Sequence, residues 1–111
     1  MQTKAKKISP RPDVKRIVEN ILGCKWSLTV IELVEQGTNR PGAMERATEG
    51  LTTKVLNERL RKLVRFGILD KTIYPEIPPR VEYYLTDFGK KFIGLLETIE
   101  KLEKELDGFK A

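Results

Sequence analysis

Hydrophobic residues recur three and four positions apart along most of the chain, which is the spacing of amphipathic helices. The first run begins after Asp13, a residue type typical of helix N-caps, and ends near Gly23. A second run covers residues 25–36 and closes at Gly37. A shorter helix is expected around residues 43–48. The first half of the chain is therefore predicted to be helical.

The best-defined helix is predicted over residues 53–66, between Thr52 as N-cap and Gly67 after its end. Its two faces differ in character. The apolar stripe consists of Leu56, Leu60, Leu63 and Val64. The polar face consists of Lys54, Asn57, Glu58, Arg61 and Arg65. The pattern indicates a helix that packs on a core and presents a basic face to solvent.

Two strand-like runs follow this helix. Residues 68–74 and 81–86 are rich in Ile, Val, Tyr and Thr, and the three prolines between them fall where no ladder hydrogen bond is lost. A short helix, a turn, a helix that can enter the major groove and then a hairpin are the order of a winged helix-turn-helix. We therefore predict an α+β fold, mainly α, with a recognition helix at about 53–66 and a wing at about 68–86.

The last segment, about residues 87–107, is predicted to be a long helix with a heptad seam. Its apolar residues alternate in steps of four and three: Phe88, Phe92, Leu95, Ile99, Leu102, Leu106 and Phe109. We expect this helix to dimerise, because so small a domain leaves part of the seam uncovered; the alternative is a helix packed wholly on its own core. The predicted dimer contacts are Val14, Ile17, Ile21, Phe92, Leu95, Ile99, Leu102 and Leu106.

Length and composition indicate the number of domains and the cellular compartment. The 111 residues suit a single domain over 13–111, preceded by a flexible basic arm at 1–12. No apolar run approaches the roughly 20 residues that span a bilayer, and no apolar stretch follows the basic start as in a secretory signal. The single cysteine excludes an intramolecular disulfide framework. We expect a cytoplasmic, nucleoid-associated protein without a membrane partner.

Charge is concentrated on the predicted recognition helix. The net charge is +5, and residues 51–67 carry five basic residues against one acidic residue. Such a run also occurs on helices that are merely solvated, so charge by itself favours a polyanionic partner only weakly. The chain has no histidine and one cysteine, so the parts of a transition-metal site or a nucleophilic triad are missing. We expect no catalysis, no metal and no cofactor.

The residue types at the start of the recognition helix suit DNA. Arg and Lys donate to guanine, Asn pairs with adenine, and Thr and Lys suit phosphates. Glu58 either reads cytosine or orients Arg61 or Lys62 through an ion pair, and Arg59 is left open between a structural pairing and a DNA contact. At the hairpin tip, Arg80 is the natural phosphate or minor-groove contact. The predicted DNA-binding residues are Lys25, Arg40, Thr52, Thr53, Lys54, Asn57, Glu58, Arg61, Lys62 and Arg80.

Several runs together resemble the HxlR-type (MarR-like) helix-turn-helix regulators. These are Lys54-Val55-Leu56-x-x-Arg59-Leu60-Arg61-x-Leu63, Gly67-Ile68-Leu69, Tyr74-Pro75-x-x-Pro78-Pro79-Arg80-Val81-Glu82-Tyr83-x-Leu85-Thr86-x-x-Gly89 and the entry Gly23-Cys24-Lys25-Trp26. The resemblance covers about residues 11–100. It implies a bacterial or archaeal homodimer that binds an operator through paired recognition helices and wings, with the first and last helices forming the dimer.

The chain departs from that family's pattern in three places. Arg11 holds the position of a redox-sensing cysteine found in many members, and Cys24 replaces a glycine. Cys24 is either a small residue at a helix start or a redox-active thiol whose pKa the helix N-terminus lowers. Residues 40–44 replace an Arg-Phe-x-Glu-Leu run, which puts the packing of the following helix in question. Thr48 stands where an apolar residue is usual.

Two classes of function compete. The leading hypothesis is a sequence-specific transcriptional regulator that acts as a homodimer on a double-stranded DNA operator, in response to an effector that the sequence does not identify. The alternative is a winged-helix protein-interaction module whose basic face binds an acidic partner without DNA. RNA binding ranks last, because the aromatic platform typical of single-strand recognition is missing.

Overall fold

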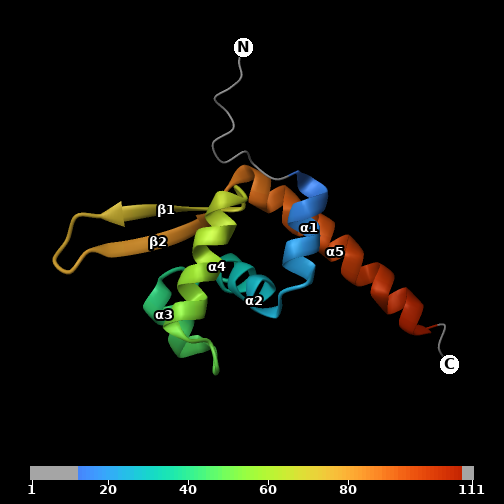
Figure 1. The fold of residues 1–111 in the computed structure, drawn as a ribbon, viewed down its shortest axis with the longest axis horizontal. Helices are drawn as coiled ribbons and strands as arrows, with labels where there is room; N and C mark the ends of the chain where they lie inside the picture. The colour runs from blue at the N-terminus through green and yellow to red at the C-terminus, as the bar shows by residue number, and fades with distance from the viewer. Residues whose placement is uncertain (1–12, 109–111) are drawn as a thin grey trace, which may run out of the picture.

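A computed structural model describes residues 13–108. The predicted arm at 1–12 and the last predicted seam residue, Phe109, lie outside the described residues. The elements follow in the order α1 (Val14–Leu22), α2 (Lys25–Glu35), α3 (Pro41–Ala47), α4 (Thr53–Arg65), β1 (Leu69–Tyr74), β2 (Arg80–Leu85) and α5 (Asp87–Gly108) (Figure 1). The described part is mainly helical with one two-stranded sheet, which confirms the predicted fold class.

Local sequence signals account for most of the helix ends. The Asp13 carboxylate accepts a hydrogen bond from the Arg16 backbone N–H at 2.9 Å and caps α1. Gly37 and Gly67, which follow α2 and α4, have φ of +96° and +81°, a region that glycine enters without steric cost. One boundary was predicted wrongly: α3 begins at Pro41, because proline at the first helical position loses no hydrogen bond.

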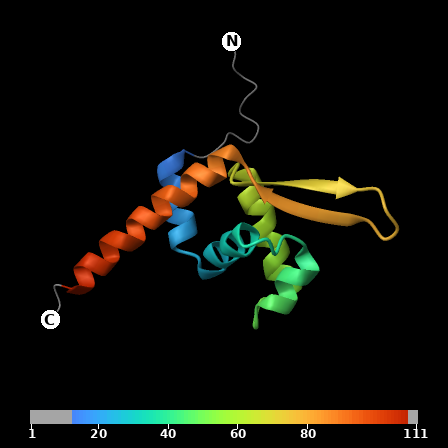
Figure 2. The ribbon, with the colours of Figure 1, turned by 180° about the vertical axis from the view of Figure 1, so that it is seen from behind.

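The hairpin is antiparallel, with Leu69 opposite Leu85 at its base and Tyr74 opposite Arg80 near its tip. Both views of the ribbon show the wing extending away from the helices, with its base beside the end of α4 (Figures 1 and 2). The backbone N–H of Tyr83 donates to the Asn39 carbonyl at 2.9 Å, so the segment before α3 also pairs with the wing. The wing is therefore tied to the helix-turn-helix and not only to its own partner strand.

One hydrophobic core joins all five helices and the base of the wing. The recognition helix contributes its predicted stripe, with Leu56, Leu60 and Leu63 at most 1% exposed. In the segment that departs from the family pattern, Met44 is fully buried and supplies the apolar anchor of α3. The unusual sequence at 40–44 thus still packs on the core.

Two close contacts fasten the start of α5 to the junction of α4 and the wing. The hydroxyl of Thr86 donates to the Gly67 carbonyl and accepts a hydrogen bond from the Gly89 backbone N–H at 2.9 Å. Gly89 is buried, and a Cβ there would fall on the carbonyl oxygen of Ile68. Only glycine permits this approach of α5 to the base of the wing.

The two halves of α5 differ in burial. Phe92 and Leu96 are 3% and 9% exposed, whereas Leu102 and Leu106 are 55% and 64% exposed. The far end of α5 extends away from the rest of the chain (Figures 1 and 2). The alternative in which α5 packs wholly on its own core is therefore wrong.

The structure corrects three of the predicted dimer contacts. Ile17, Ile21 and Phe92 are at most 3% exposed within a single chain, so they have no surface to offer a partner. Apolar spacing predicts the buried face of a helix, but it does not say which element covers that face. Between residues 13 and 108, no helix is both long and apolar enough to cross a membrane.

Candidate nucleic-acid interface

The helix-turn-helix consists of α3, the turn at residues 48–52 and α4. In the turn, Gly50 has φ of +89°, and a Cβ there would lie 3.7 Å from the indole of Trp26. Trp26 thus supports the turn from the side of α2, and the Lys25 ammonium lies 4.8 Å from the centre of its ring. Lys25 is exposed at the start of α2. The indole of Trp26 therefore lies beside the turn that leads into α4.

The first two threonines of the predicted contact set have structural partners. The Thr52 hydroxyl oxygen caps α4 by accepting from the Val55 backbone N–H at 3.2 Å. The Thr53 hydroxyl donates to the Glu45 carboxylate of α3 at 2.8 Å. These side chains fix α4 against α3, while the first backbone N–H groups of α4 remain at an exposed helix start, where anions bind favourably.

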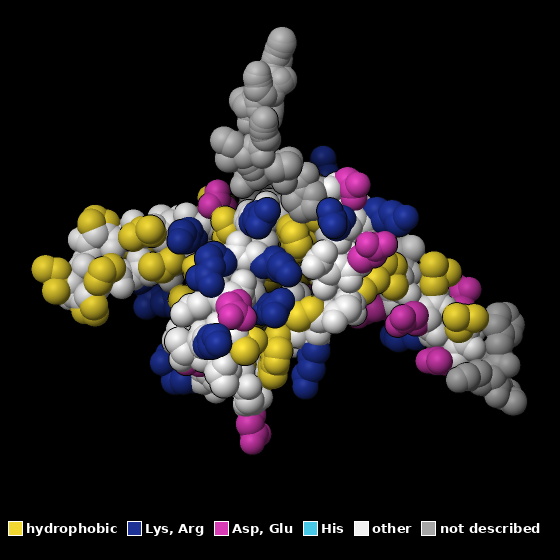
Figure 3. Space-filling model, viewed as in Figure 1, with side chains coloured by type: hydrophobic (Ala, Val, Ile, Leu, Met, Phe, Trp, Pro, Cys, Tyr) yellow, Lys and Arg dark blue, Asp and Glu magenta, His cyan; other side chains and the backbone are white. Residues whose placement is uncertain are grey.

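Three other predicted contacts are free to reach a ligand. Lys54, Asn57 and Arg61 are exposed on the outer face of α4. Within residues 13–108, these three side chains form no side-chain hydrogen bond or ion pair. Figure 3 shows Lys and Arg side chains gathered over α4 on the face turned to the viewer. This face carries the donors that base edges and phosphates require.

Other polar residues of α4 lie differently from the prediction. The predicted ion pair of Glu58 with Arg61 or Lys62 is absent, since the ion pairs within residues 13–108 all join Arg40 or Arg80 to Glu76 or Glu82. Lys62 instead donates from its Nζ to the Asn20 side chain of α1 at 3.3 Å. Arg59 is half-buried, and its Nε has no partner. A contact with the neighbouring helix α1, not an i, i+4 pair within α4, therefore orients Lys62.

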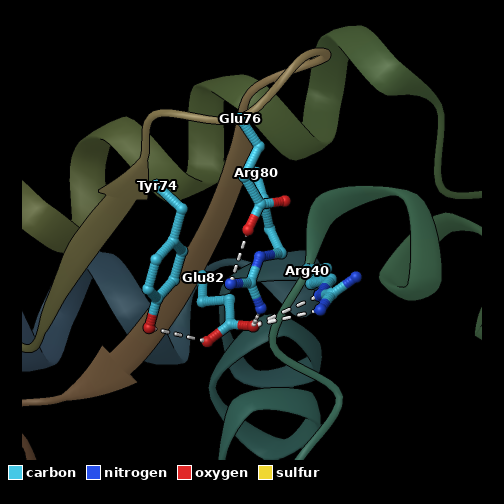
Figure 4. A network of polar contacts seen from close by, with 5 residues as sticks. All are labelled: Arg40, Tyr74, Glu76, Arg80 and Glu82. Atoms are coloured by element: carbon cyan, nitrogen blue, oxygen red, sulfur yellow. Dashed lines mark hydrogen bonds and ion pairs between the residues drawn. The ribbon is translucent and has the colours of Figure 1, made fainter.

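The wing carries a network of charged residues that meets at Glu82 (Figure 4). One Glu82 carboxylate oxygen lies 3.0 Å from the Arg80 guanidinium and 3.3 Å from that of Arg40. Arg80 also pairs with Glu76 at 2.9 Å, and its guanidinium carbon lies 3.9 Å from the centre of the Tyr74 ring. The Tyr74 hydroxyl donates to the other Glu82 oxygen at 3.4 Å.

This network changes the interpretation of the wing. Arg80 was predicted to be a phosphate or minor-groove contact, but the structure places its guanidinium between two carboxylates. Arg40, predicted as a DNA contact at the start of α3, shares one of these carboxylates. The hairpin motif that is most recognisable in the sequence therefore serves first to build the wing itself.

Cys24 is the N-cap residue of α2 and is half-buried. Burial by itself raises the pKa of this thiol, but hydrogen bonds with Ser27 and the positive charge of Arg59 outweigh burial and lower it. The pKa of Tyr83 on β2 is also shifted: burial raises it, and the positive charge of Arg61 on α4 opposes that rise. Within residues 13–108, no group of histidine, cysteine or acidic side chains is placed to hold a metal ion.

A short helix, a glycine turn, a capped helix with an exposed basic face and a hairpin wing together define a winged helix-turn-helix protein. The sequence matches the model of the HxlR-like helix-turn-helix family over residues 21–108. The chain belongs to this family, as its motifs indicate.

Relatives from several organisms agree with this assignment. The chain is 42% identical over 85 residues to an uncharacterized HTH-type transcriptional regulator of Synechocystis, sll1512, covering 77% of this chain and 63% of the relative. It is 35% identical over 86 residues to the uncharacterized HTH-type transcriptional regulator YvaP of Bacillus subtilis, covering 78% and 80%. The aligned part thus spans less than two thirds of the Synechocystis protein.

Solved structures share the fold. A protein described as a transcriptional regulator of the MarR family, from Enterococcus faecalis V583, superimposes with a TM-score of 0.77 at 32% identity and covers 100% of this chain and 96% of its own. A second protein so described, from Porphyromonas gingivalis W83, has a TM-score of 0.65 at 31% identity and covers 95% and 98%. The arrangement of helices and wing is therefore the one found in these two structures.

Proposed function

We propose that this protein is a cytoplasmic, sequence-specific DNA-binding transcriptional regulator that acts as a homodimer on an operator. The observation that carries the proposal is the exposed face of α4, where Lys54, Asn57 and Arg61 have no partner among the described residues. In a helix-turn-helix this face enters the major groove. The protein acts by binding, and no step of this function requires catalysis.

Some residues of α4 contact bases in this proposal, and others contact the DNA phosphates. Asn57 and Arg61 lie one turn apart and present the groups that pair with adenine and guanine. Lys54 and the backbone N–H groups at the start of α4 bind phosphate, where the helix dipole also favours an anion. Lys25 on α2 and Lys62 on α4 are also exposed and add positive charge. Base contacts then supply the specificity, and phosphate contacts set the register on the duplex.

The exposed apolar residues of α1 and α5 form the proposed dimer interface. Val14 and Leu22 on α1 are 50% and 44% exposed, and Leu95, Leu102 and Leu106 on α5 are 38%, 55% and 64% exposed. Ile99 lies on the same seam and is half-buried. A second copy of the chain offers the same seam in return, so pairing would cover both.

Titration of fluorescent DNA tests the proposal. DNA from upstream of the protein's own gene is compared with a scrambled duplex at several salt concentrations. We expect preferential binding, with affinity that falls steeply as salt rises because phosphate contacts release counterions. Binding without sequence preference would contradict the regulator, and absence of binding at low salt would favour the acidic-partner alternative.

The dimer is tested by placing charges on its proposed seam. Replacing Ile99 and Leu102 with lysine should give monomers and abolish operator binding, because the seam is then polar and repels its copy. The matched control replaces Glu100 with lysine, an exposed position outside the seam. Light scattering measures the mass, and a dimer that persists in the double variant would place the interface elsewhere.

A further inference from the structure

The wing and the start of α3 enclose an open groove with a volume of about 470 Å³. Its walls are Arg40, Pro41 and Gly42 on one side and residues 76–81 of the wing on the other. In a helix-turn-helix the first helix crosses the DNA backbone, so the start of α3 lies near phosphate in the complex proposed above. Arg40 and Arg80, the two arginines that line this groove, would then face the backbone.

These two arginines present no net positive charge. Both pair with the same oxygen of Glu82, and Arg80 also pairs with Glu76, so two guanidinium groups meet two carboxylates. The Glu82 side chain is 23% exposed, compared with 52% for Arg40. The carboxylate is therefore the fixed member of the pair, and the arginine is the member that can leave.

Arg40 and Arg80 differ in how firmly they are held. Arg80 has two carboxylate partners and lies against the Tyr74 ring, whereas Arg40 meets Glu82 alone at 3.3 Å. An ion pair with one partner as exposed as Arg40 is weak, so a phosphate in the right position can replace the carboxylate. A phosphate that approaches loosely meets instead the negative charge of Glu82.

We propose that Glu82 is a specificity-determining residue that holds Arg40 away from non-cognate DNA. On an operator, α4 binds in the major groove of the DNA and brings a phosphate into the protein groove between the wing and the start of α3. There Arg40 leaves the Glu82 carboxylate and binds the phosphate. On random DNA the exchange does not occur, so Glu82 lowers the non-specific affinity. Arg80 keeps its carboxylates throughout and maintains the shape of the wing. This inference rests on the proposed DNA-binding function.

A backbone hydrogen bond should hold the wing in place when the Glu82 side chain is changed. The hydrogen bond from the Tyr83 N–H to the Asn39 carbonyl joins the wing to the segment before α3 without any side chain. Glu82→Gln keeps the size of the side chain and one acceptor oxygen, while it removes the charge and replaces the other acceptor oxygen with an NH2 group. The substitution should therefore leave the wing in place and free Arg40.

Binding of Glu82→Gln to operator and to scrambled DNA is measured by fluorescence anisotropy at several salt concentrations. The affinity for scrambled DNA should rise roughly 3- to 10-fold, and the slope of log K against log salt should steepen by about 0.9 for each phosphate gained. Operator affinity should rise less, because Arg40 already binds phosphate there. The ratio of the two affinities should fall.

Two further variants separate the charge of Glu82 from its structural contacts. Adding Arg40→Gln to Glu82→Gln should restore the wild-type affinity and salt slope on scrambled DNA. Glu100→Gln, which removes an equal charge from the exposed face of α5, should leave both unchanged. Glu76→Gln at the wing tip removes a carboxylate that pairs with Arg80 and not with Arg40, so it should leave the affinity for scrambled DNA unchanged. Arg40→Gln by itself serves if Glu82→Gln does not fold: operator binding should weaken and its salt slope should fall by about 0.9 for each phosphate lost, while binding to scrambled DNA stays unchanged.

The outcomes are distinct. If Glu82→Gln weakens binding to both DNAs with an unchanged salt slope, Glu82 is only a support of the wing and the inference is wrong. The inference also fails if Glu82→Gln binds scrambled DNA as the wild type does. Failure of the wild-type protein to bind any DNA would instead reject the proposed function.

Discussion

The recognition helix α4 and the neighbouring wing differ in whether their basic side chains are paired with carboxylates. On α4, Lys54 and Arg61 project into solvent without partners among the described residues, whereas on the wing Arg80 is held by two carboxylates. Hydrophobic side chains cover the wing tip in Figure 3, and Ile73 and Ile77 there are 59% and 101% exposed. A distinctive sequence motif therefore need not coincide with a surface whose charges are free.

The largest expected effect tests how the wing is held. Gly89→Ala places a methyl group on the Ile68 carbonyl at the base of the wing, which should destabilise the protein by about 2–3 kcal/mol and lower Tm by roughly 10 °C. Gly94→Ala is the control on the same helix, since no atom lies within 4 Å of its added Cβ, and it should be neutral or slightly stabilising. Calorimetry that finds equal Tm values for the two variants would show that α5 does not fix the wing.

The second test removes one positive charge from each region. Arg61→Ala on α4 should weaken operator binding by about 2 kcal/mol, roughly 30-fold, and relax specificity, because a base contact is lost. Lys71→Ala on the exposed side of β1 should change it less than about 2-fold. Anisotropy on operator and scrambled DNA measures both. An equal loss from the two variants would remove the contrast between helix and wing.

A smaller effect is expected from the cap of α4. Thr52→Ala removes the hydrogen bond to the Val55 N–H and should cost about 1 kcal/mol of stability, while the salt slope of DNA binding stays unchanged. Thr98→Ala at an exposed position of α5 should change stability by less than about 0.5 kcal/mol. Denaturant unfolding gives the stability. A shallower salt slope for Thr52→Ala would mean that its hydroxyl also binds phosphate.

The smallest expected effect concerns the reactivity of Cys24, whose thiol lies near the charge of Arg59 on α4. Because the pKa of Cys24 is lowered, its reaction with iodoacetamide should reach half-maximal rate at a lower pH than that of a free cysteine. Arg59→Gln should move that midpoint upward, since the charge of Arg59 favours the thiolate. The folded pKa lies below the unfolded one, so this thiol adds stability above the unfolded pKa and loses it as pH falls through the folded pKa. A pH profile that Arg59→Gln leaves unchanged would exclude this role.

Helix ends were predictable because their causes are local. Asp13 and Thr52 cap helices within three residues of themselves, and Gly67 ends α4 through its own φ. The stripe of Leu56, Leu60 and Leu63 follows from helical spacing alone. Part of the candidate site was predictable for the same reason, since the polar face of α4 is the side opposite that stripe.

The roles of Arg40, Arg80 and Lys62 were not predictable in this way. Arg40 lies 42 residues from Glu82, and Lys62 lies 42 residues from Asn20, so only the folded chain brings each pair together. An exposed arginine and a paired arginine look alike in a sequence. Ile17 and Phe92 were assigned to a dimer because periodicity identifies a buried face without naming what buries it.

The order of the elements, the core face of each helix and the family could be predicted from the sequence, because spacing, caps and turn residues act over a few neighbours. Which charges remain free was set by the tertiary structure. It compensated the arginines of the wing and left those of α4 open, because ion pairs depend on atoms that lie within a few ångströms in space. The same folding covered the first half of the α5 seam and left the second half exposed.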